Sequence, residues 1–409
     1  MSTLTEMPCE IIISVLRELD DVRFLLPSLL TCHYVYSCFK QNPGVAVDIL
    51  QRQIHLAIIP YSVAVLEATR LDPRYDTDVY ELLGTLYTEP SKFTERLRTM
   101  PVPLLARMGH VYELIHTFAT EFASSAWTHL STDQESEVAG SLVLSPSEYI
   151  RFLRNFYRVE LYFCLFRSAP NTPFREQLFF FNQPPWETEQ VACVHDFLEL
   201  KLSKASYDVL AHDVELGELE IDYITAGDNQ FRQLWLSQGV DFTHKLTSES
   251  SYDDKKSLLK SAFGGQKADL YDKLIEPLET DLDDHTPLSG YTEKDLAAEF
   301  TPMEGQDTDK GPFEAWRVTF NPLPPSAWVM LTNNSGLRER AYVLWDLDRI
   351  EKYGLLKLFD NAPKDSELQH TPNDYDEMNE SFKERSEICR KGGSGHWSKN
   401  DESRIVWSK

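Results

Sequence analysis

Apolar residues recur at spacings of three and four over most of the chain, the pattern that places them on one buried face of an α-helix. This pattern predicts helices at 8–19, 25–39, 45–59, 104–127, 146–166, 187–210, 255–278 and 338–359. From Tyr149 to Phe166 apolar residues surround the helix, so we expect it to lie at the centre of the protein. Alternation with a period of two, typical of strands, is limited to short pieces such as 316–320. The sequence therefore predicts an all-α fold.

The chain also divides into segments of different composition. A helical body is expected over 46–275, and a C-terminal helical part of that body over 313–360. Between them, 276–312 is acidic and is predicted to be a linker, either a solvated loop or a docking site for a basic partner. The stretch 361–409 is polar and is predicted to be a partly disordered tail, with Trp397 and Trp407 available to anchor parts of it.

The first 45 residues form a separate helical segment in this pattern. Pro8 suits a first helical turn because its missing N–H has no intrahelical acceptor there, and Glu10 favours the positive end of the helix. One apolar stripe follows, made of Ile11, Ile12, Val15, Leu16 and Leu19, with Ile13 off the stripe. The second stretch, 25–39, is apolar around its circumference and stops before Asn42-Pro43-Gly44. A pair of helices this short cannot bury its own apolar surface. The rest of the chain or another protein must cover that surface.

The run MPCEIIISVLRELDD from Met7, followed by LLPSLLTC from Leu25, resembles the F-box of fungal F-box-like proteins. The stretch 337–350 also resembles a part of such proteins, although its aromatic residues are expected in the core. The resemblance implies a segment that binds the adaptor subunit of an SCF ubiquitin ligase and, through it, a cullin. It assigns the adaptor-binding role to Pro8, Ile11, Ile12, Val15, Leu16, Leu19, Leu25, Leu29 and Leu30. Met7, Phe24 and Pro27 depart from the usual F-box pattern.

Charge and composition narrow the classes of partner. The 409 residues carry 40 Lys and Arg against 65 Asp and Glu, a net charge of −25, which disfavours nucleic acid and anionic membranes. No apolar stretch approaches the roughly 18 to 20 residues that span a bilayer. Hydrophobic residues make up 42%, enough to build a core. The six cysteines show no disulfide or zinc spacing and are expected to be reduced thiols. We expect a soluble protein of the cytoplasm or nucleus.

Candidate chemistry is sparse. His195-Asp196 and His212-Asp213 with Glu215 have the side chains of a metal site, but their spacing completes no known ligand set. The sequence contains no catalytic motif, so we expect neither an enzyme nor a cofactor.

Three hypotheses follow. The first is a substrate receptor that holds an unknown target for ubiquitination. The second is a non-catalytic helical scaffold with the F-box-like hairpin packed inside it. The exposure of Ile12, Leu16 and Leu29 distinguishes the two: if helices of the same chain seal these residues, the substrate-receptor hypothesis is greatly weakened. The third is a metal enzyme, which requires His195 and His212 to converge.

Overall fold

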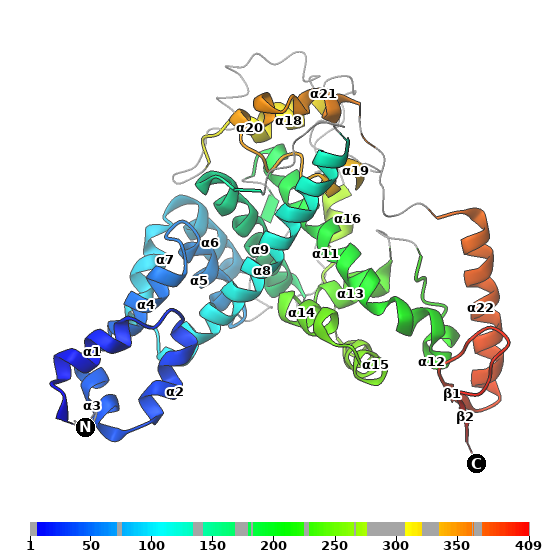
Figure 1. The fold of residues 1–409 in the computed structure, drawn as a ribbon, viewed down its shortest axis with the longest axis horizontal. Coiled ribbons are helices and arrows are strands. Elements are labelled where there is room, and N and C mark those ends of the chain that lie inside the picture. Colours follow the sequence, from blue (N-terminus) through cyan, green and yellow to red (C-terminus); the bar gives the residue numbers. More distant parts are fainter. Residues whose placement is uncertain are drawn as a thin grey trace.

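The computed structural model describes residues 6–71, 76–133, 142–167, 179–180, 183–224, 229–265, 267–275, 307–320, 335–361, 363 and 370–408. Within these ranges the chain is helical apart from two short strands, which confirms the all-α fold. In Figure 1 the molecule has the outline of an inverted V, with the N-terminal helices at one lower end and the C-terminal elements at the other. No helix of the described ranges is both long and apolar enough to cross a membrane.

The N-terminal arm is built from short helices. They are α1 (Cys9–Arg17), η2 (Val22–Phe24), α2 (Leu25–Leu30), α3 (His33–Gln41), α4 (Val45–Gln53), α5 (Ile59–Ala68), α6 (Asp76–Thr88), α7 (Ser91–Arg96) and η3 (Leu97–Thr99). The single helix predicted over 25–39 is wrong, because Cys32 adopts an extended conformation with φ −158° and ψ 146°. This residue ends α2 and lets α3 turn to pack against both α1 and α2.

Three long helices form the centre of the molecule, α8 (Val102–Asp133), α9 (Pro146–Phe166) and α11 (Pro185–His212). The prediction for α9 is confirmed at both ends: a capping box joins Ser145 and Glu148 at its start. Its position in the core is confirmed as well, since even Arg151 and Arg158 are fully buried. Arg151 donates to Asp346 at 3.0 Å, and Arg158 pairs with Glu187, so these buried charges are compensated.

Shorter helices surround the long ones, and several break a predicted helix. They are α12 (Val214–Glu218), α13 (Gln230–Leu236), α14 (Val240–Ser248), α15 (Tyr252–Ser261), α16 (Leu270–Ile275), α18 (Gly311–Phe320), α19 (Ser335–Glu339), α20 (Leu347–Lys352) and α21 (Leu355–Asp360). The helix predicted over 338–359 is interrupted where Ala341 and Gly354 have positive φ. Its aromatic residues Tyr342 and Trp345 are fully buried, as expected. The helix predicted over 255–278 is likewise split into α15 and α16.

The strand signal at 316–320 is wrong, because this segment lies in α18. Phe313 and Trp316, three residues apart, both pack against Trp186, with ring centroids 5.2 and 6.1 Å away. A spacing of three presents both rings to one neighbour only in a helix. Most of the predicted acidic linker, 276–306, lies outside the described residues. Its end is anchored, since Asp307 accepts from Arg151 at 2.6 Å.

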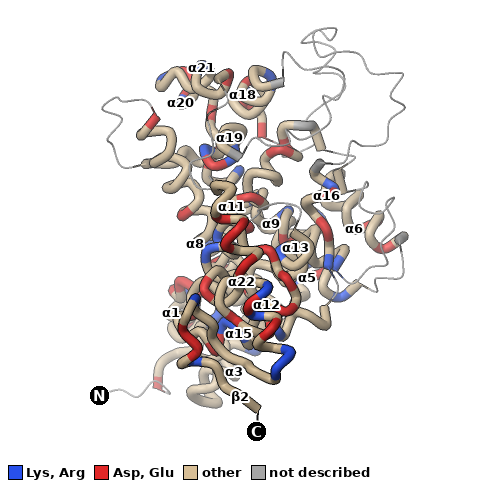
Figure 2. The backbone as a smooth tube through the Cα atoms, turned by 90° about the vertical axis from the view of Figure 1, so that its right-hand side faces the viewer, with Lys and Arg blue, Asp and Glu red and all other residues tan. Residues whose placement is uncertain are grey.

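The C-terminal stretch contains α22 (Pro372–Arg390) and the antiparallel strands β1 (Gly393–Gly395) and β2 (Ile405–Trp407). Within the stretch predicted to be a partly disordered tail, residues 370–408 therefore contain a helix and a strand pair. The helix starts at a capping box of Thr371 and Asp374, and it packs its few apolar residues against α12 and Ile224. Acidic residues recur along its other positions (Figure 2). Trp397 is buried as an anchor, whereas Trp407 is 45% exposed.

One hydrophobic core runs from Ile12 in α1 to Phe359 in α21, so the N-terminal segment and the body share it. The C-terminal elements rest on two small separate clusters. One contains Val214, Ile388, Trp397 and Ile405, and the other contains Ile224, Met378 and Phe382.

Candidate functional site

Helix α1 carries two neighbouring apolar stripes, about 100° apart around the helix axis, one facing the core and the other facing solvent. Ile12 and Leu16, four residues apart, are buried against the neighbouring helices. Ile11 and Val15, also four residues apart, are 49% and 57% exposed. Residues four apart lie above one another on a helix, so α1 presents one apolar pair to the core and a second pair to solvent.

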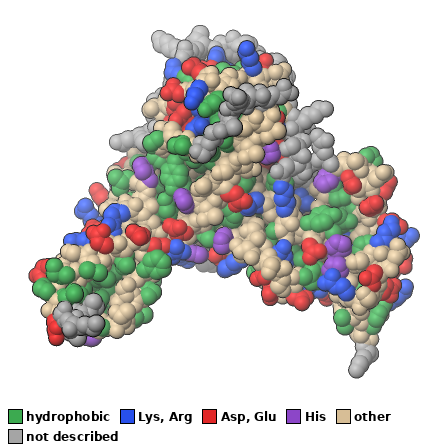
Figure 3. Space-filling model, in the orientation of Figure 1, with side chains coloured by type: hydrophobic (Ala, Val, Ile, Leu, Met, Phe, Trp, Pro, Cys, Tyr) green, Lys and Arg blue, Asp and Glu red, His purple; other side chains and the backbone are tan. Residues whose placement is uncertain are grey.

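Helix α2 repeats this arrangement. Leu25 and Leu29 are buried, whereas Leu26 is 39% exposed and Leu30 is 78% exposed. Of the fourteen large hydrophobic side chains that are exposed in the described ranges, six lie between residues 11 and 36, a segment of less than a tenth of the chain. We call Ile11, Val15, Phe24, Leu26, Leu30 and Tyr36 the N-terminal apolar surface. Figure 3 shows hydrophobic side chains over the end of the arm that carries α1–α3.

The nine residues assigned by the F-box resemblance therefore separate by burial. Exposed members are Pro8, Ile11, Val15 and Leu30, and Leu19 is half-buried. The buried members, Ile12, Leu16, Leu25 and Leu29, lie in the protein's own core and cannot contact a partner in this conformation. Sequence reasoning missed Phe24, Leu26 and Tyr36, and it placed the buried Ile13 outside the stripe.

Contacts with the body fix the orientation of the N-terminal segment. Val22 in η2 is fully buried against Gly109 of α8, where an added Cβ would come within 2.6 Å of the valine. The Val22 N–H donates to the side chain of Gln53 at 3.2 Å. Arg52 donates to the Leu19 carbonyl at 3.0 Å. These contacts hold α1 and α2 so that the inward apolar pair of each helix faces the core and the outward pair stays at the surface.

The two histidine motifs lie in different places. His195 and His212 are 17 positions apart on α11, about 25 Å at the helical rise of about 1.5 Å per residue. The convergence required by the metal-enzyme hypothesis is therefore not found. His195 Nδ1 lies 3.1 Å from Asp196 and Nε2 lies 3.2 Å from Gln233, so both ring nitrogens have partners. The expectation that His195 and His212 converge on one metal ion is wrong, because α11 holds the two rings apart.

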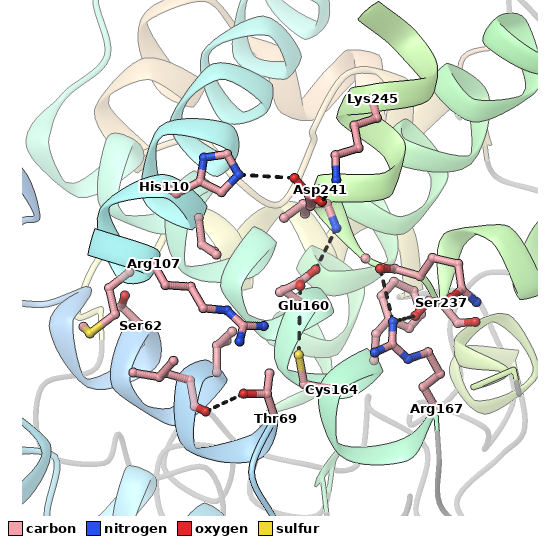
Figure 4. A pocket seen from close by; sticks show the side chains of 18 residues that line it. Ser62, Thr69, Arg107, His110, Glu160, Cys164, Arg167, Ser237, Asp241 and Lys245 are labelled. Carbon is pink, nitrogen blue, oxygen red and sulfur yellow. Dashed lines mark hydrogen bonds and ion pairs between the residues drawn. The ribbon is translucent and has the colours of Figure 1, made fainter. Parts of the chain in front are cut away.

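A pocket of about 460 Å³ opens between α5, α8, α9 and the start of α14 (Figure 4). Glu160 of α9 lies at its centre and accepts a hydrogen bond from the Val240 N–H at 2.8 Å. Burial raises the pKa of this carboxyl, while the bond to Val240 and the charge of Arg167 oppose the rise. Figure 4 also shows Arg107 reaching toward the pocket from α8.

Two further groups of the pocket, Asp241 and Cys164, are engaged or unreactive. Asp241 lies 3.2 Å from His110 Nε2 and pairs with Lys245 at 2.5 Å. Burial raises the pKa of the Cys164 thiol, so this sulfur is protonated near neutral pH and is a poor nucleophile. The geometry can accommodate a small polar molecule, but it does not activate the cysteine.

Comparison with known proteins gives no match: no protein-family model, no curated protein and no solved structure is similar to this chain.

Proposed function

We propose that the N-terminal apolar surface docks onto the adaptor subunit of an SCF ubiquitin ligase and so connects this chain to a cullin. The observation that carries the proposal is the outward apolar pair on each of α1 and α2, with Val15 57% and Leu30 78% exposed. These pairs lie within the run that resembles the F-box. Exposed apolar groups gathered in one segment are typical of a surface that a partner covers.

The energetics of docking favour the outward pairs over the buried members of the motif. Each Å² of apolar surface removed from water contributes about 25 cal/mol, and this gain is open only to side chains still exposed before binding. The buried residues act indirectly, since Ile12 and Leu29 hold their helices in place. In this proposal Pro8, which is also exposed, lies at the start of the surface.

The rest of the chain would hold an unknown target protein. The N-terminal arm and the C-terminal elements lie at different ends of the molecule, so a partner on the first leaves the second accessible (Figure 1). We assign no catalytic group to this chain in that role. Its contribution is proximity, and the transfer chemistry belongs to partner subunits.

Binding of the purified full-length chain to the SCF adaptor tests the proposal, using a Val15→Asp, Leu30→Asp double variant. Both side chains are exposed, so the variant keeps its fold while two charges disrupt the surface. The matched control is Leu56→Asp, Leu219→Asp, in which the residues are 62% and 48% exposed outside the N-terminal apolar surface. We expect the wild type and the control to bind, and the affinity of the test variant to fall by more than about tenfold.

A second function is favoured by a specific observation. Ile12, Leu16 and Leu29 are sealed by the same chain and belong to the common core. This burial weakens the substrate-receptor hypothesis and is what a helical scaffold without a ligase connection requires. If the wild-type chain fails to bind the adaptor, the receptor proposal is rejected and the scaffold is retained. Equal loss of binding in the test and control variants would also count against the N-terminal apolar surface.

A further inference from the structure

Three side chains with metal-binding atoms meet where α11 ends and the C-terminal strands begin. Asp208 and His212 are four residues apart on α11, so they lie on one face of the helix. His396 comes from the segment that follows β1, far away in the sequence. One carboxylate oxygen and one nitrogen from each ring all lie within 4.8 Å of one another.

The protein fixes the proton position on His212. Its Nδ1 lies 3.0 Å from the carbonyl oxygen of Trp397, and the Trp397 N–H donates to the His212 carbonyl at 2.7 Å. A carbonyl oxygen only accepts, so Nδ1 carries the proton and Nε2 has a free lone pair. Metal-bound histidines are commonly oriented by this kind of bond from the second ring nitrogen to a carbonyl.

His396 is a nearly buried ring whose Nδ1 forms no hydrogen bond with the residues that the structure describes. Its side chain is only 10% exposed, and Nδ1 is buried with no partner. Nε2 is 3.9 Å from Asp208 Oδ1, beyond hydrogen-bond distance. The ring stacks on His212 with centroids 4.7 Å apart. An unsatisfied buried nitrogen costs about 1–3 kcal/mol, so bonding of this nitrogen to a ligand would be favourable.

Two carboxylates lie near the paired rings, and they differ in whether they can serve as ligands. Asp213 is already paired with Lys256 at 2.6 Å and with Tyr252 at 2.7 Å, so it is not available as a ligand. The Asp208 side chain is 59% exposed and can rotate inward.

We propose that Asp208, His212 and His396 bind one divalent transition metal ion of the zinc class, which fastens the C-terminal elements to α11. Two imidazole nitrogens and one carboxylate oxygen are donors that suit this ion, with water as a fourth ligand. Ligand distances of about 2.0–2.2 Å require the three donor atoms to move closer together than they lie here. The His396 ring must also rotate out of its stack with His212, because the lone pair of each imidazole lies in the plane of its ring. The site links the main core to the small cluster around Trp397, and it is independent of the proposed adaptor surface.

The test is metal titration of the full-length protein, prepared without a polyhistidine tag and stripped by a chelator. Zn²⁺ is added in competition with a chromophoric chelator, and Co²⁺ is added while the visible absorption of its ligand field is recorded. We expect one equivalent to bind to the wild type, and the affinity to fall by about tenfold or more in Asp208→Asn and in His396→Asn. His370→Asn is the matched control, since it removes an exposed histidine near the start of α22.

A second measurement reports on the structural consequence. Amide hydrogen exchange of 393–408 is expected to slow when Zn²⁺ is added to the wild type, and to be unchanged by Zn²⁺ in Asp208→Asn. Asp208 is at the surface, so its variant folds even if His396→Asn does not. The proposal is overturned if the wild type binds no stoichiometric metal, or if Asp208→Asn binds and responds as the wild type does.

Discussion

At the scale of single residues, the turn before α14 depends on Gly239. Its φ of 91° and ψ of −177° lie in a region that is essentially restricted to glycine. A Cβ at this position would also come within 2.8 Å of both carboxylate oxygens of Glu160. The glycine therefore lets the Val240 N–H reach Glu160 at 2.8 Å and closes the wall of the pocket.

We predict that Gly239→Ala lowers the free energy of unfolding by about 1–3 kcal/mol from backbone strain, with a further loss from the contact with Glu160. Urea denaturation of the purified protein measures this change. Gly84→Ala is the control, because it lies within α6 and a Cβ there would meet no atom within 4 Å. The control is expected to be stabilised by up to about 1 kcal/mol. A similar effect in both variants would contradict the prediction.

A second residue-scale feature is the charge on buried His195. Burial alone lowers the pKa of this ring, but the hydrogen bond to Asp196 and the negative charges of Glu199 and Asp196 outweigh it and raise the pKa above 6.5. Asp196 is in turn paired with Arg338 at 3.0 Å. The folded protein therefore binds this proton more tightly than the unfolded chain does.

Linkage gives the sign of the pH effect. The stabilisation from His195 is fully present below pH 6.5, the unfolded pKa, and is lost as pH rises through the higher folded pKa. We predict that the difference in unfolding free energy between the wild type and His195→Gln shrinks as pH is raised from 6.5. Urea denaturation of both proteins across a pH series measures it. A difference that grows with pH would contradict the assignment of a raised pKa.

At the scale of elements, α1 shows how one helix serves two environments. Its inward pair is covered by α3 and α4, and its outward pair is in water. We predict that Ile12→Ala lowers the free energy of unfolding by about 2–5 kcal/mol, because it leaves a cavity in the core. Ile11→Ala on the same helix is expected to change it by no more than about 0.5 kcal/mol. Chemical denaturation compares the two directly, and equal losses would show that the outward pair is covered.

The ends of a helix can be predicted from the sequence where a capping motif stands directly before a run of apolar residues. The ends of α9 are predicted correctly because Ser145, Pro146 and Glu148 form a strong N-terminal signal ahead of an apolar run. The stretch 338–359 has an equally apolar pattern, yet it is broken into α19, α20 and α21. There the core receives side chains from turns as well as from helices, and apolar spacing does not distinguish the two.

At the scale of the whole molecule, the protein consists of one large core and a lightly attached C-terminal part. α9 is enclosed on all sides, whereas α22 contacts the body through a few residues such as Phe382 and Ile388. Arg385 strengthens this attachment, since its Nη1 donates to the Leu210 carbonyl at 2.6 Å and to the Asp213 carbonyl at 3.0 Å.

We predict that amide hydrogen exchange is slowest in α9 and clearly faster in α22 and the β1–β2 pair, because local opening costs less where few apolar contacts are lost. Exchange followed by mass spectrometry on the metal-free protein measures the order. Equal protection of α22 and α9 would mean that the C-terminal elements unfold only together with the main core.

The sequence by itself determined the helical class of the fold, the central helix α9 and the presence of an apolar N-terminal segment, since these depend on local periodicity and capping. Only the tertiary structure decided which of the two apolar stripes on α1 and on α2 faces the core. Both stripes have the same periodicity in the sequence, and they differ only because neighbouring helices cover one of them. It likewise decided the pairing of His212 with His396, which are 184 positions apart. Contacts across such distances depend on how the elements pack, and no local pattern contains that information.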